Sequence, residues 1–256
     1  MIVIKNERIE SIPLLHVVNQ KLDSEKLPLV VFIHGFTSAK EHNLHYAYLL
    51  AEKGFRVVMP DALYHGQRDM VLSEQELYIH FWDIVITTIH DLKKIKNHFL
   101  EQKLIDPDKI GVVGTSMGAI ATLGALTQYE WIKAAVSLMG LANFGEFSLW
   151  QLEQIKKQGY KLNLTNEQID RQLSILSEYD LSLHQHKLNN RPLLFWHAKN
   201  DNTVPYSLTY PFYKNIKNGY EQNPEKLEFI TDEYAGHKVS KAGVKATVDW
   251  FSKFLK

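Results

Sequence analysis

The chain has 256 residues, of which 45% are hydrophobic, which is enough to bury one sizeable core, so a single domain spanning residues 1–256 is expected. Its 29 basic and 29 acidic residues balance, so no overall field favours nucleic acid, an anionic membrane or a highly charged substrate. The absence of cysteine excludes disulfides, thiolate zinc sites and a cysteine nucleophile, and it suits a reducing cytoplasm. Residues 1–7 do not resemble a signal peptide, and no apolar run approaches the roughly 18 residues of a membrane span, so we expect a cytoplasmic protein.

An antiparallel hairpin or meander is expected in residues 1–20, because apolar side chains alternate with polar ones around Asn6 and Glu7. Further along, short continuous apolar runs replace this alternation. Such runs are typical of strands that are buried on both faces of a parallel sheet. They occupy residues 29–33, 57–59, 110–113, 134–138 and 193–196, and a further strand is expected at 227–230.

Helical segments separate these strands. The clearest one begins at the capping pair Ser73 and Glu76 and carries one apolar stripe over about five turns, as far as Phe99. A second amphipathic pattern runs from Val244 to Leu255. Strands that alternate with helices are joined by right-handed crossovers, so the sequence predicts an α/β fold with a mostly parallel central sheet and helices on both faces.

Residues 141–190 interrupt this alternation. They place 50 residues between two strand candidates where a single crossover helix would suffice, and they carry two amphipathic helical patterns. Trp150 belongs to the first pattern, and Thr165 with Gln168 is expected to cap the second. We expect a helical cap or lid over the carboxyl edge of the sheet; the alternative is a structural excursion with no role at the site.

A candidate nucleophile stands where an apolar strand run meets a run of small residues. The segment Gly114-Thr115-Ser116-Met117-Gly118 places a serine on the turn between a strand and a helix. This is the setting of a nucleophile elbow, in which a strained turn exposes the hydroxyl and glycines two residues to either side prevent a collision. The motif alone is weak, but its position makes Ser116 the candidate nucleophile.

A serine hydroxyl needs a base, and the base needs an acid that fixes its tautomer. In one common chain order the acid follows the serine and the histidine comes last. Asp201 lies in the loop after the strand that ends at His197, and His237 follows a glycine in the loop after the next strand. His237 is also the only histidine after His197. We therefore predict Asp201 as the acid and His237 as the base.

Two backbone N–H groups are needed to hold the oxyanion, one from the residue after the nucleophile and one from the loop after an earlier strand. Met117 supplies the first. Gly35 permits an unusual turn in the loop after residues 29–33, so the amide of Phe36 is the expected second donor.

Other residues at the same edge are candidate substrate contacts. His34, and His65 in the loop of residues 61–68, follow strands whose carboxyl ends meet where ligands bind in open α/β sheets. The alternative for this loop is that its side chains only order the loop itself. Trp150, with two nearby phenylalanines, either lines an acyl pocket or packs the cap.

The histidines outside these loops do not indicate a metal site. His42 and His45 lack an HExxH pattern and are expected on the surface of a helix. His184 and His186 fit no known metal spacing and have no assigned role. The sequence therefore predicts no metal site.

The segment 32–36, the elbow at 114–118, Asp201 and His237 together resemble the α/β-hydrolase superfamily, from about Leu29 onward. The resemblance implies the α/β-hydrolase fold. It also implies hydrolysis of carboxylic esters through a covalent acyl-serine, without a cofactor.

Within the superfamily, the loop of residues 61–68 and the segment 201–205 resemble single-domain bacterial esterases related to the dienelactone hydrolases and to the catalytic domain of prolyl oligopeptidases. Two departures weaken the transfer of those substrate classes. Dienelactone hydrolases use a cysteine nucleophile, which this chain lacks, and prolyl oligopeptidases carry a propeller, for which 256 residues leave no room.

The expected activity is a serine esterase acting on a small-molecule ester, with no nucleic-acid partner and with the oligomeric state left open. A peptidase or a thioesterase on the same site is one alternative. A ligand-binding protein that kept the scaffold without turnover is another, because fold does not fix function.

Overall fold

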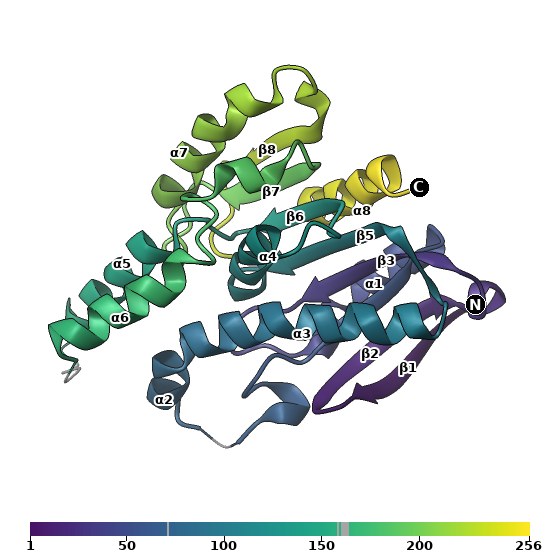
Figure 1. Cartoon of the computed structure of the whole chain (residues 1–256), viewed down its shortest axis with the longest axis horizontal. Coiled ribbons are helices and arrows are strands. Elements are labelled where there is room, and N and C mark those ends of the chain that lie inside the picture. The colour runs from purple at the N-terminus through teal and green to yellow at the C-terminus, as the bar shows by residue number, and fades with distance from the viewer. Residues whose placement is uncertain (71, 158, 160–163) are drawn as a thin grey trace.

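The computed structural model describes residues 1–70, 72–157, 159 and 164–256. Within these ranges eight strands form one sheet in the order β1-β2-β4-β3-β5-β6-β7-β8 (Figure 1). The first hairpin is antiparallel and β2 pairs antiparallel with β4, whereas all other neighbours are parallel. The strands are β1 (Ile2–Ile9), β2 (Ile12–Asn19), β3 (Leu27–Ile33), β4 (Arg56–Pro60), β5 (Ile105–Thr115), β6 (Ala134–Leu138), β7 (Leu193–Ala198) and β8 (Leu227–Asp232).

Each apolar run lies inside one of these strands, so the predicted mostly parallel sheet is confirmed. The N-terminal hairpin is confirmed as well. Its turn lies at Glu10 and Ser11, because Ile9 pairs with Ile12, and Asn6 and Glu7 lie in the middle of β1.

Helices cover both faces of the sheet, as predicted. The buried side chains of α1 and α8 belong to the core on one face of the sheet. Those of α3, α4, α5 and α7 belong to the core on the other face (Figure 1). The helices are α1 (Leu44–Glu52), α2 (Glu74–Ile79), α3 (Phe81–Glu101), α4 (Met117–Gln128), α5 (Phe144–Lys157), α6 (Asn166–Ser177), α7 (Tyr206–Ile216) and α8 (Lys241–Phe254).

The helix expected from Ser73 to Phe99 is two helices, and this part of the prediction is wrong. The capping box at Ser73 and Glu76 is present and begins α2. The backbone leaves the helical conformation at His80, and only α3 carries the buried stripe. Tyr78 and Ile79 in α2 are exposed, so no shared buried face holds the two helices on one axis.

The segment 141–190 contains the two predicted helices, α5 and α6, and Thr165 caps the second. They lie side by side and project beyond the sheet in Figure 1. Phe144 and Phe147 are buried against Trp82 of α3, so the base of this pair belongs to the core. Residues 158 and 160–163 of the expected cap lie outside the described part.

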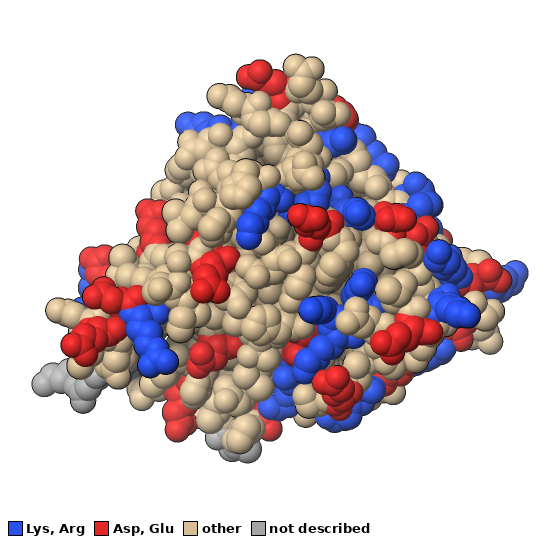
Figure 2. Space-filling model, in the orientation of Figure 1, with Lys and Arg blue, Asp and Glu red and all other residues tan. Residues whose placement is uncertain are grey.

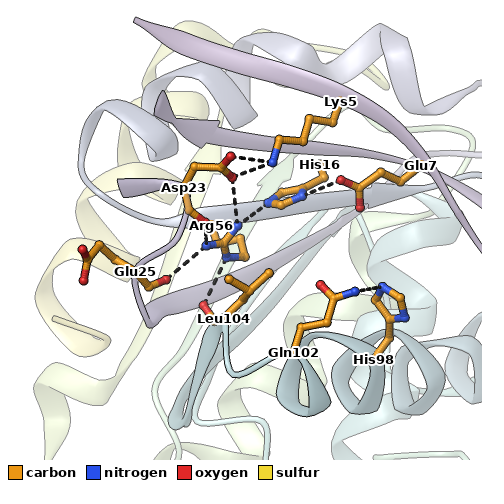
Figure 3. A network of polar contacts seen from close by, with 9 residues as sticks. All are labelled: Lys5, Glu7, His16, Asp23, Glu25, Arg56, His98, Gln102 and Leu104. Atoms are coloured by element: carbon orange, nitrogen blue, oxygen red, sulfur yellow. Dashed lines mark hydrogen bonds and ion pairs between the residues drawn. The ribbon is translucent and has the colours of Figure 1, made fainter. Parts of the chain in front are cut away.

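A polar network centred on the buried Arg56 lies at the edge of the sheet where the parallel strands begin (Figure 3). Arg56, at the start of β4, donates to the carbonyl groups of Asp23, Glu25 and Leu104 at 2.7, 3.1 and 3.1 Å. It also donates to the imidazole of His16. Because its partners come from three separate segments, this guanidinium joins β2, the loop before β3 and the loop before β5.

Acidic and basic side chains occur together across the face shown in Figure 2, in keeping with the balanced composition. None of the helices in the described ranges combines the length and the apolar character needed to cross a bilayer.

Candidate active site

Ser116 occupies a strained turn between β5 and α4. Its φ of 52° and ψ of −117° lie in a region of backbone conformation that residues other than glycine rarely adopt. A Cβ on Gly114 would lie 2.2 Å from the carbonyl of Gly118, and a Cβ on Gly118 would lie 2.2 Å from the carbonyl oxygen of Ile33. The predicted reason for the two glycines is therefore confirmed: strand and helix meet too closely for any side chain.

The structure brings Ser116, His237 and Asp201 together, although they are far apart in the sequence. The Ser116 hydroxyl lies 2.8 Å from Nε2 of His237, and Nδ1 of His237 lies 2.7 Å from Oδ2 of Asp201. With Nδ1–H donating to the carboxylate, Nε2 has a free lone pair that accepts from the serine. The Asp201 side chain is buried, whereas that of His237 is 25% exposed. The imidazole thus joins a buried charge to an accessible hydroxyl.

Asp201 is held as a carboxylate. Burial alone would raise its pKa, but hydrogen bonds from His197 and His237, the positive charge that His237 can carry, and the backbone N–H of Val204 lower the pKa below its usual range. Oδ1 accepts from the N–H groups of Thr203 and Val204, both at 2.9 Å. Since Oδ1 is held by the loop, Oδ2 faces the histidine.

His197, the last histidine before the acid, has a contact that the sequence did not predict. Its Nε2–H donates to the carbonyl of Val204 at 2.9 Å and lies 3.5 Å from Oδ2 of Asp201. The shorter distance identifies the carbonyl as the main acceptor. The only sequence signal was a histidine at the end of a strand directly before the acid loop.

The two expected oxyanion donors lie on two segments that meet at the elbow. Met117 is the first residue of α4, where no helical carbonyl accepts its N–H. Phe36 follows Gly35, and a Cβ on Gly35 would lie 3.6 Å from Cβ of Ser116. The loop that carries Phe36 therefore packs directly on the elbow. The unusual turn expected at Gly35 is instead at Thr37, whose φ is +57°.

His34 is fully buried and both of its ring nitrogens are bonded to backbone. Nδ1–H donates to the carbonyl of Gly35 at 2.7 Å, and Nε2 accepts from the N–H of Ala62 at 3.0 Å. Burial lowers its pKa to about 4, so the ring is neutral at pH 7. The predicted substrate contact is therefore not available to its ring nitrogens.

His65 is bonded in the same way. Nδ1–H donates to the carbonyl of Leu63 at 2.8 Å, and Nε2 accepts from the N–H of Thr37 at 3.0 Å. Burial also lowers its pKa. For His65 the geometry favours the alternative interpretation, in which its side chain orders the loop, and His34 is bonded to two loops in the same way.

A cavity of about 210 Å³ lies between these loops, and its lining includes Thr37, Ser38, Tyr64 and His65. Trp150 does not line this cavity. It is half-buried and stacks on Phe147 at a ring-centroid distance of 5.5 Å. Its assignment to substrate binding stays a prediction.

The other histidines lie as their sequence context suggested. His42 and His45 are exposed, and His184 donates to the carbonyl of Ser177 at 2.9 Å. In the described part of the chain, no cluster of three or more histidine, aspartate or glutamate side chains has the geometry to hold a metal ion.

Fold and site together define a class, the α/β-hydrolase fold with a serine, a histidine and an aspartate joined at the carboxyl edge of the sheet. Residues 41–256 match the prolyl oligopeptidase family. The chain belongs to this family, as its resemblance to the catalytic domain indicated.

Two relatives align over their full length and over this whole chain. One is "Putative esterase YitV" of Bacillus subtilis (strain 168), 51% identical, and the other is "Esterase YjfP" of Escherichia coli (strain K12), 29% identical. Among solved structures, the Pyrococcus horikoshii acylaminoacyl peptidase superposes on the whole chain with a TM-score of 0.73 at 20% identity. The match covers 42% of that peptidase, and the likeness establishes the fold.

Proposed function

We propose that the protein is a serine esterase that hydrolyses small carboxylic esters through an acyl-serine intermediate. The observation that carries this proposal is the hydrogen-bonded chain from Asp201 through His237 to Ser116 on a strained elbow. Two full-length relatives whose names describe them as esterases support it.

The proposed reaction has two halves. Ser116 Oγ attacks the ester carbonyl while Nε2 of His237 takes the hydroxyl proton, and the carbonyl oxygen becomes an oxyanion held by the amides of Phe36 and Met117. The carbon–alcohol bond then breaks, and His237 gives its proton to the leaving alkoxide. A water molecule, deprotonated by His237, attacks the acyl-serine; the acid departs and Ser116 regains its proton. Asp201 stabilises the imidazolium throughout.

The cavity on the loop that carries Phe36 is the space we propose for a small substrate, although its lining includes no residue of the triad. The cavity between Thr37 and Tyr64 has a volume of about 210 Å³ and begins two residues beyond Gly35, which lies against the elbow. A cap formed by residues 141–190, a substrate contact from Trp150 and a cytoplasmic location belong to the same proposal.

The test is intact-protein mass spectrometry after treatment with a fluorophosphonate probe, which labels an activated serine without requiring the natural substrate. We expect one label on the native protein and none on Ser116→Ala or His237→Ala, with both variants folded by circular dichroism. Unchanged labelling of Ser116→Ala would refute the assignment of the nucleophile. A folded native protein that takes no label would favour a ligand-binding protein.

A peptidase is the second candidate, because the chain belongs to the prolyl oligopeptidase family. Turnover of matched ester, thioester and anilide substrates with one acyl group separates the three activities. We expect the largest kcat/KM for the ester. A larger value for the anilide would make peptide hydrolysis the main activity.

A further inference from the structure

Two loops at the carboxyl edge of the sheet are joined by a reciprocal pair of hydrogen bonds. His34 on the loop after β3 accepts the N–H of Ala62 on the loop after β4. His65 on the second loop accepts the N–H of Thr37 on the first. Both distances are 3.0 Å, and the ring centroids lie 5.2 Å apart. We call this arrangement the histidine clasp.

We infer that His34 and His65 are positioning residues, which fix the Phe36 amide in the oxyanion hole by clasping its loop to the loop after β4. The inference rests on the proposed function. It replaces direct substrate contact as the role of these histidines.

The clasp requires neutral rings in one tautomer. Each ring donates from Nδ1 to a carbonyl of its own loop and accepts at Nε2 from the other loop. An imidazolium has no acceptor, so only the neutral ring makes both bonds. The burial that lowers the pKa of both residues keeps them neutral.

Backbone strain lies on both sides of the clasp. Thr37 and Tyr64 have φ values of +57° and +60°, which residues with a Cβ rarely adopt. Such conformations persist where their surroundings determine them, and they are concentrated at functional sites. The N–H that His65 accepts belongs to the strained Thr37 itself, so this bond holds the residue directly after Phe36.

A buried ion pair also joins the same two loops. Lys40 Nζ lies 2.6 Å from Oδ2 of Asp61, its backbone N–H donates to Oδ1 at 3.1 Å, and both side chains are fully buried. Asp61 also accepts from the N–H of Gln67 at 3.0 Å. The ion pair is thus a second link between the two loops, from Lys40, seven residues beyond β3, to Asp61, the first residue after β4.

The position of the first loop matters for the reaction because it packs on the nucleophile. A Cβ on Gly35 would be 3.4 Å from the carbonyl oxygen of Thr115 and 3.6 Å from Cβ of Ser116. A shift of about 1 Å in a group that positions the reacting atoms costs roughly 100-fold in rate. Releasing Thr37 would therefore lower kcat more than it weakens substrate binding.

The test compares His65→Ala and His65→Gln with the native protein, using an ester substrate and a pair of matched ketones. A trifluoromethyl ketone forms a bond from Ser116 Oγ to its carbonyl carbon, passes the hydroxyl proton to His237 and places an oxyanion in the hole. The matched methyl ketone reports ground-state binding. The ratio of the two inhibition constants therefore measures the oxyanion hole.

We expect His65→Ala to lower kcat by about 10- to 100-fold with KM changed by less than about twofold, and to lower the preference for the trifluoromethyl ketone by a similar factor. His65→Gln should recover most of both, because its amide oxygen can accept from Thr37. His16→Ala is the matched control: its ring is equally buried but lies at the other edge of the sheet. It should lower the melting temperature without changing the ketone ratio.

If His65→Ala keeps the native kcat and the native ketone preference, the inference is overturned but the proposed function is not. A loss in His65→Ala that His65→Gln does not recover and that His16→Ala shares would also overturn the inference, because that pattern describes general destabilisation. A native protein that neither hydrolyses esters nor takes the fluorophosphonate label would overturn the proposed function, and the clasp's assigned role with it.

Discussion

The two edges of the sheet each hold a histidine bonded on both ring nitrogens, and their surroundings differ. At the amino edge, His16 donates to Glu7 at 3.0 Å and accepts from Arg56, and both the His16 ring and the Arg56 guanidinium are buried (Figure 3). At the carboxyl edge, His237 links buried Asp201 to the Ser116 hydroxyl and remains partly exposed.

The difference shows what separates a structural network from a reactive one. The Arg56 network ends on backbone carbonyl groups, which have no proton to give and are fixed in the fold. The His237 network ends on a hydroxyl that stands on a strained turn. We therefore expect changes at the amino edge to alter stability, and changes at the carboxyl edge to alter catalysis.

The largest expected effect is on catalysis at the carboxyl edge. Asp201→Asn should lower kcat by roughly 10⁴-fold, because the amide favours the wrong tautomer of His237 and cannot stabilise its cation. Steady-state ester hydrolysis measures this, with the exposed Asp108→Asn as the control for loss of a carboxylate. An Asp201→Asn variant with near-native kcat would exclude this residue as the acid.

The corresponding change at the amino edge should affect folding. Arg56→Met removes the fully buried guanidinium that donates to the carbonyl groups of Asp23, Glu25 and Leu104, so we expect a loss of about 3–5 kcal/mol in the free energy of unfolding. Urea denaturation measures it, and Arg8→Met, at an exposed position, is the control. The activity of each folded molecule should not change; a large fall in kcat would contradict the division between the edges.

A pH series tests His34, one of the buried histidines of the carboxyl edge. Burial lowers the pKa of His34 from 6.5 to about 4, so between these values the unfolded chain binds a proton that the folded chain does not. Stability should therefore rise with pH across this range, and His34 should account for up to about 3 kcal/mol. Denaturation at pH 4, 5, 6 and 7 should show a shallower slope for His34→Gln; equal slopes would contradict the lowered pKa.

The smallest effect is expected at the rim of the amino-edge network. Lys5 and Asp23 form an ion pair at 2.6 Å, but about a third of each side chain is exposed. Lys5→Ala should cost less than about 1 kcal/mol, and the difference should shrink in 1 M salt. Thermal melts at two salt concentrations measure it. A loss as large as that of Arg56→Met would show that the rim is as important as the buried guanidinium.

Most of the fold could be predicted because its signals are local. Continuous apolar runs mark buried parallel strands, and each run lies inside one strand of the sheet. The break at His80 could not be predicted, since α2 and α3 share one helical pattern. The fully buried stripe begins only in α3, whereas Leu77 in α2 is partly buried and Tyr78 and Ile79 are exposed. That depends on tertiary packing, which periodicity does not report.

The site divides in the same way. Chain order and loop position were enough to select Ser116, Asp201 and His237, because parallel strands deliver their loops to one edge. The contacts of His34 and His65 were not predictable, since each spans 28 residues between two loops. Thr37 takes the turn expected at Gly35 for the same reason: its N–H is held by a residue from another loop.

The close backbone contacts at Gly114 and Gly118 have a consequence for engineering new selectivity. Hypothetical Cβ atoms there would overlap main-chain atoms of α4 and β3, which cannot turn aside as a flexible side chain can. Libraries that randomise these two positions should return almost only the parent glycine. Diversity is better placed at exposed positions of nearby segments, such as Met70 after β4 and Leu149 in α5, where a new side chain faces solvent and displaces no buried group.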